Sequence, residues 1–152
     1  MNIFTAPAVR PLLRKLGDIR LAIVRLRRAS EWAAGYPIQQ GVGVWSGFGP
    51  FAGGTFKGFS YSYLRKDGST YVGTTPPPGW KEESEQYKAL VRQWWTALEE
   101  LKKAYAAEYE RDIVRSMTER GYPMNPEGIR TEAARVAYDR VIFGPFGRPH
   151  QW

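Results

Sequence analysis

Cysteine is absent from the sequence, and histidine occurs once, as His150. Without cysteine, disulfides, thiolate nucleophiles and cysteine-based zinc sites are excluded. His150 lies in the Gly/Pro-rich segment FGPFGRPHQW, a poor place to hold a catalytic base in hydrogen-bond geometry. No phosphate loop, GxSxG or HExxH motif occurs. The sequence therefore predicts a protein that is not an enzyme and that holds no cofactor or metal.

Long apolar runs are also missing. No run approaches the roughly 18 apolar residues that a membrane-spanning helix needs, and the first residues lack the basic-then-apolar order of a secretion signal. We expect no membrane span, and we expect the protein to lie in the cytoplasm or in a virion.

Acidic residues are scarce at the start of the chain. The net charge is +7, and residues 1–35 alone carry seven basic and two acidic side chains. Such a basic stripe is typical either of a surface for nucleic acid, acidic protein or anionic lipid, or of an ordinary solvent-exposed helix. The charge alone leaves both interpretations open.

Apolar residues recur at alternating spacings of three and four in three segments, which predicts helices over about 8–34, 82–120 and 126–143. Asn125-Pro126-Glu127 is a typical helix start, and Gly35, Gly121 and Gly144 are typical ends. The second helix would be roughly 55–60 Å long, which is too long for a compact globule of this length. We therefore expect a single, mainly α domain over 1–152: an elongated antiparallel helical hairpin made of the first two helices, with the third folded back.

Residues 36–80 form a Gly- and aromatic-rich insertion with a different pattern. Residues 59–63 alternate between aromatic and small polar residues, and Asp67-Gly68 is a strong two-residue turn signal. A small β part with a β-hairpin at about 58–74 is therefore expected. Its aromatic face either packs on the helices or stacks on unpaired bases beside Lys57, Arg65 and Lys66.

The segment FGPF occurs twice, at 48–51 and at 143–146. Each copy is a stiff, extended apolar strip that cannot bury both of its rings on itself. It must lie in a groove, either of its own chain or of a neighbour. Residues 144–152 thus form a candidate extended docking arm. Trp95 lies one residue off the apolar stripe of the long helix, so it either widens the buried face or anchors an interface.

Two functional hypotheses follow. The first is a non-enzymatic structural protein that docks onto neighbouring subunits of a large homo- or hetero-oligomeric complex, in the style of capsid or head-tail components of virions. Its contact residues would be aromatic: Phe48, Phe51, Trp95, Phe143, Phe146 and Trp152. The alternative is a nucleic-acid-binding module, for instance for DNA, that grips phosphates through basic residues: Arg25, Arg27, Arg28, Lys57, Arg65 and Lys66.

Overall fold

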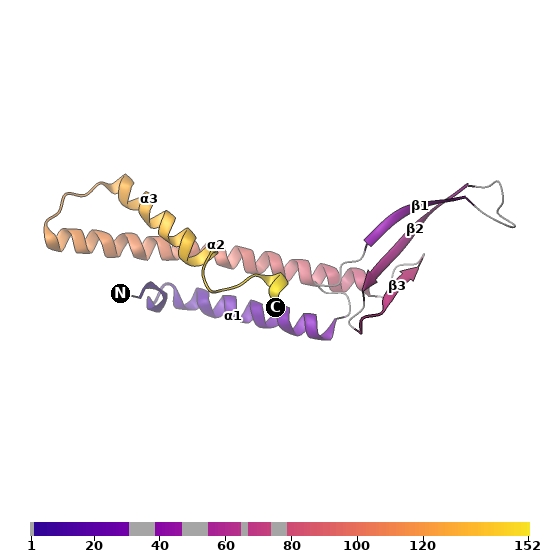
Figure 1. Cartoon of the computed structure of the whole chain (residues 1–152). Helices are drawn as coiled ribbons and strands as arrows, with labels where there is room; N and C mark the ends of the chain where they lie inside the picture. The colour runs from indigo at the N-terminus through magenta and orange to yellow at the C-terminus, as the bar shows by residue number, and fades with distance from the viewer. Residues whose placement is uncertain (1, 31–38, 47–54, 65–66, 74–78) are drawn as a thin grey trace. The chain divides into compact units, whose positions relative to one another are not determined.

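A computed structural model describes residues 2–30, 39–46, 55–64, 67–73 and 79–152 (Figure 1). This described part is mainly helical, as the apolar spacing predicted. Its long helices are α1 (Arg10–Ala29) and α2 (Trp80–Arg120), followed by the shorter α3 (Pro126–Ala137). The chain divides into two compact units, Met1–Ile23 with Leu90–Trp152, and Val24–Ala89. Each unit is described by itself.

The first unit begins with a short 3₁₀ turn, η1 (Ile3–Thr5), which the side chain of Asn2 caps by accepting a hydrogen bond from the Phe4 N–H at 3.1 Å. In this unit, residues further along η1 and α1 contact residues earlier in α2. The ring of Phe4 lies 5.1 Å from that of Tyr105, and Lys15 Nζ lies 3.3 Å from Glu100 Oε2. The two helices are therefore antiparallel in this unit.

The core of the first unit is built from the apolar stripes of three helices. A heptad-like stripe lets each helix bury one face against its neighbours while its charged face stays in water. Its buried side chains include Val9, Leu16, Ile19 and Ile23 on the α1 side, Trp94, Ala97, Leu98 and Leu101 on α2, and Ile129, Ala133, Ala137 and Val141 beyond it.

The third helix begins as its sequence predicted. Asn125 caps α3 by accepting from the Gly128 N–H at 3.3 Å, and Pro126 occupies the first helical position. The helix does not run uniformly to Phe143, however. After Ala137 it widens into a π-helical turn, η3 (Tyr138–Ile142), in which the Phe143 N–H donates to the Tyr138 carbonyl.

The second unit contains the end of α1, the strands and the start of α2. The prediction that α1 continues through Ser30 is wrong, because the helix ends at Ala29; positions 31–38 lie outside the described residues. Ser30 is buried, and its Oγ donates to Glu83 Oε2 at 2.7 Å. That contact joins the end of α1 to the first turns of α2.

Three strands follow in chain order: β1 (Gln39–Ser46), β2 (Thr55–Leu64) and β3 (Thr70–Gly73). They form an antiparallel sheet in the order β1-β2-β3, with Val42 opposite Phe59 and Tyr63 opposite Tyr71. Between β2 and β3, Gly68 has φ +88°, and the Ser69 N–H donates to Asp67 Oδ1 at 2.8 Å. This left-handed conformation accounts for the glycine in the Asp67-Gly68 pair.

Within the described ranges, no helix combines the length and the apolar character needed to span a bilayer. The long α2 carries charged side chains along its whole length.

Candidate functional site

The C-terminal arm, residues 144–152, packs against other segments of its own chain. The indole of Trp152 packs edge-on against Trp94 with ring centroids 5.3 Å apart, and the Arg20 guanidinium lies 4.9 Å from the Trp152 ring. Earlier in the arm, the ring of Phe146 meets that of Phe4 at 5.8 Å. The arm thus contacts its own chain, and its docking onto a neighbour stays a prediction.

Two glycines shape the arm locally. A Cβ at Gly144 would overlap the carbonyl oxygen of Arg140, so the chain can turn closely past the end of η3 only with glycine. Gly147 has φ +74°, and a Cβ there would come within 2.9 Å of the Trp152 indole nitrogen. A final 3₁₀ turn, η4 (Pro149–Gln151), then brings Trp152 back against the helices.

Phe143, just before the arm, is exposed. Its side chain is 62% exposed, and its ring packs edge-on against Tyr138, itself 46% exposed, at 5.2 Å. Lys102 of α2 places its ammonium 5.9 Å from the centre of the Tyr138 ring. We call Tyr138 and Phe143 the aromatic pair.

The aromatic pair depends on the π-helical turn. In an α-helix, residues five apart lie about 140° apart around the axis and do not face each other. The wider turn of η3 brings residues 138 and 143 onto one side. Sequence reasoning identified Phe143 but missed Tyr138, because nothing in the sequence signalled a π-helical turn.

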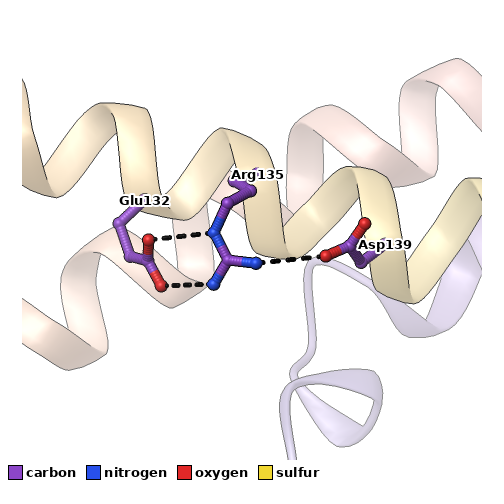
Figure 2. Close-up of polar contacts among 3 residues, drawn as sticks. All are labelled: Glu132, Arg135 and Asp139. Atoms are coloured by element: carbon purple, nitrogen blue, oxygen red, sulfur yellow. Dashed lines mark hydrogen bonds and ion pairs between the residues drawn. The ribbon is translucent and has the colours of Figure 1, made fainter.

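An ion-pair cluster lies beside the aromatic pair, at the junction of α3 and η3. Figure 2 shows Arg135 between Glu132 and Asp139, with N–O distances of 2.7 Å and 3.2 Å. The hydrogen bond from Arg135 holds the pKa of Glu132 below its usual value. The cluster thus places charged side chains next to Tyr138 in the sequence, at the end of α3 and in η3.

Trp95 lies at the edge of the core. Its ring packs edge-on against the buried Trp94 at 4.9 Å, and its side chain is still 37% exposed. Its role as an interface anchor stays a prediction. Phe48 and Phe51 lie outside the described residues.

The predicted nucleic-acid residues belong to the second unit, where the structure describes the side chains of three of the six. Arg25 and Arg28 are exposed near the end of α1, and Arg27 is half-buried. Burial raises the pKa of the Tyr87 hydroxyl, and the positive charge of Arg27 opposes that rise. Lys57 is placed by its backbone in β2, opposite Val44. Arg65 and Lys66 lie outside the described residues, so the expected basic cluster stays a prediction.

Several carboxylates on α2 form ion pairs with basic side chains of the same helix. Glu99, Glu108 and Asp112 each pair with a basic residue three positions further on.

The described part of the chain contains no group of three or more acidic or histidine side chains placed to hold a metal ion. His150 is exposed in η4. An open hollow on α2 is lined by Ala107, Glu110, Arg111, Val114 and Arg115.

Compared with protein-family models, with curated proteins and with solved structures, the chain has no match.

Proposed function

We propose that the chain is a non-enzymatic assembly protein that docks onto protein neighbours through the aromatic pair, Tyr138 and Phe143. The single observation that carries this proposal is the exposure of Phe143, at 62% the most exposed of the large apolar side chains described. Trp95 is a second contact on the same unit.

Two aromatic rings held edge-to-face on a surface have the character of an interface hot spot. Their mutual packing fixes the rings before binding, so little side-chain entropy is lost when a partner covers them. Burying such rings contributes roughly 1.5–3 kcal/mol each, and tyrosine is enriched among hot-spot residues. The surrounding charges of Lys102, Arg135 and Asp139 supply the polar rim.

A virion as the setting stays a prediction from the sequence.

The test is a comparison of two truncations of exposed apolar side chains, Phe143→Ala and Leu21→Ala. Leu21 is 47% exposed on α1 and serves as the matched control. We expect Phe143→Ala to lower the weight-average mass that sedimentation measures at high protein concentration. Leu21→Ala should leave this mass unchanged, and both variants should keep the circular dichroism spectrum of the wild type. Equal masses for wild type and Phe143→Ala across the concentration range would contradict docking between copies through the pair. Deleting residues 144–152 is a poorer test because the arm packs on the core.

Nucleic-acid binding is the second candidate, favoured by the exposure of Arg25 and Arg28 in a chain of net charge +7. A fluorescent DNA oligonucleotide, single- or double-stranded, is the probe. Affinity should fall steeply with salt and should weaken further in the charge reversal Arg25→Glu/Arg28→Glu. The control is Arg10→Glu/Arg130→Glu, which makes the same charge change at exposed positions of the other unit. Equal affinity for the two double variants would reject a specific role of Arg25 and Arg28.

A further inference from the structure

We infer that one face of the three-stranded sheet binds single-stranded nucleic acid by stacking bases on a row of aromatic residues. This inference rests on the second candidate function, nucleic-acid binding, and names its ligand as a single strand. It is independent of docking through the aromatic pair, which belongs to the other unit.

The register of the sheet gathers aromatic residues on one of its two faces. Residues two apart along a strand share a face, and so do residues directly opposite each other on neighbouring strands. Phe59, Tyr61 and Tyr63 of β2 therefore lie on the same face. Tyr71 of β3 lies opposite Tyr63 and joins them. We call these four residues the aromatic sheet face.

The other face of β2 has a different character. It carries Gly58, Ser60 and Ser62, and Gly58 lies opposite Gly43 of β1. Antiparallel sheets commonly cover one face and leave the other in water, and the covered face is the apolar one. The aromatic sheet face is therefore the one that needs a partner.

The described helices of the second unit do not supply that partner. Outside the sheet and its turn, the described residues of this unit are 24–30 and 79–89, and among them only Ser30 is buried. A helix that covered an aromatic sheet would bury apolar side chains of its own against it. The aromatic sheet face thus has no cover among the described helical residues of its unit.

The charges of the segment that contains the sheet favour an anionic ligand. Residues 36–80 carry three basic side chains and one acidic one, a net charge of +2. Lys57 of β2 shares the aromatic sheet face, because it precedes Phe59 by two residues. The one acid, Asp67, is used within the turn, where its Oδ1 accepts from the Ser69 N–H at 2.8 Å and from the Ser69 hydroxyl at 2.6 Å. A polyanion is therefore complementary to this segment.

A ligand with flat rings and a negatively charged backbone fits both the aromatic residues and the charge. Every base has a face that can stack on an aromatic side chain, and the bases of a single strand are free to do so. Residues of one face follow each other along β2 at about 6.8 Å, so neighbouring rings can each take a base. A duplex offers only its phosphates and the edges of its bases. The arrangement thus favours a single strand over a duplex.

The first test measures fluorescence anisotropy of the intact chain with an oligothymidylate, an oligouridylate and a DNA duplex of the same length. We expect both single strands to bind more tightly than the duplex. Tyr61→Leu keeps an apolar side chain without a ring and should weaken single-strand binding roughly 5- to 150-fold. Tyr61→Phe keeps the ring and should retain the affinity of the wild type. Ser60→Ala, on the other face of the same strand, is the matched control.

The second test uses the wild-type protein, so it does not depend on how well a variant folds. A single strand that contains bromouracil is bound and irradiated, and the protein is then cut with trypsin. Cleavage after Lys57 and Arg65 releases residues 58–65 as one peptide, which contains Phe59, Tyr61 and Tyr63. We expect the adduct on this peptide or on the peptide that contains Tyr71. Adducts confined to other peptides would overturn the inference.

The two tests also separate this inference from the function on which it rests. If the duplex binds as tightly as the single strands and Arg25→Glu/Arg28→Glu weakens it while Tyr61→Leu does not, nucleic-acid binding stands and stacking falls. If neither single strand nor duplex binds at low salt, both are rejected. An equal loss of affinity in Tyr61→Leu and Ser60→Ala would also contradict stacking, because only one of these residues lies on the aromatic sheet face.

Discussion

The indole of Trp152 meets the indole of Trp94 edge-on, with ring centroids 5.3 Å apart and ring planes at 78°. Trp94 is fully buried in α2, and Trp152 is held on its other side by the Arg20 guanidinium. An edge-to-face pair adds roughly 0.5–1.5 kcal/mol to the burial of its surface. The end of the arm is thus part of the packing of the first unit.

Replacing Trp152 by alanine should destabilise the protein by about 2–3 kcal/mol, which is less than the value for a fully buried tryptophan because this side chain is partly exposed. The midpoint of thermal unfolding should fall by roughly 5–10 °C. Lys103→Ala, at an exposed position of α2 in the same unit, is the control and should leave the midpoint nearly unchanged. A Trp152→Ala midpoint equal to that of wild type would show that the arm does not hold the helices.

Two glycine-to-alanine changes should have opposite effects on the free energy of unfolding. At Gly17, in α1, a Cβ meets nothing within 4 Å, so alanine should stabilise the helix by about 0.5–1 kcal/mol. At Gly144 the added Cβ would overlap the Arg140 carbonyl, and alanine should cost about 1–3 kcal/mol. Urea unfolding of both variants checks this pair. Stabilisation at both positions would mean that the turn after η3 is looser than described.

Ser30→Ala should lower the free energy of unfolding by about 1–2 kcal/mol, because it removes a hydrogen bond between a buried hydroxyl and the charged Glu83. Glu83→Gln keeps an acceptor oxygen for the Ser30 hydroxyl and should cost less. Chemical denaturation of the two variants gives the comparison. An equal or larger loss for Glu83→Gln would assign the effect to the charge of Glu83 and not to the bond.

Alkaline pH should weaken the first unit through Tyr105. Burial raises the pKa of its hydroxyl above its usual value, against the opposing charge of Arg140. The folded state then keeps a proton that the unfolded state has lost, so this contribution to stability is present below about pH 10 and disappears as the pH rises further. Tyr105→Phe keeps the ring but cannot titrate. We expect its unfolding free energy to fall less steeply above about pH 10 than that of wild type, and parallel slopes would contradict the assignment.

The helical part of the fold could be predicted because its signals are local. For the first predicted helix, the three–four spacing identified Val9, just before α1, and Leu16 and Ile23 within it, and all three are buried. The cap at Asn125 and the glycine at Gly121, with φ +71°, mark the boundaries between α2 and α3. Spacing and capping are properties of neighbouring residues, so a single sequence carries them.

The candidate site could be predicted only in part, because its contacts are not local. Phe4 and Phe146 meet across almost the whole sequence, and no pattern joins them. Tyr138 reaches Phe143 only through a π-helical turn. The sequence predicted that the arm needs a surface to pack on, and only the packing of distant segments showed that it contacts its own chain.

The first unit draws its packing from both ends of the sequence, since Phe4 and Trp94 each contact the arm. On a ribosome, these contacts cannot form until residue 152 has left the exit tunnel. Residues 24–89 of the second unit emerge much earlier and can begin to fold during synthesis. The two units are therefore completed at different times: the second can begin to fold before Trp152 is synthesised, and the first cannot be completed until then.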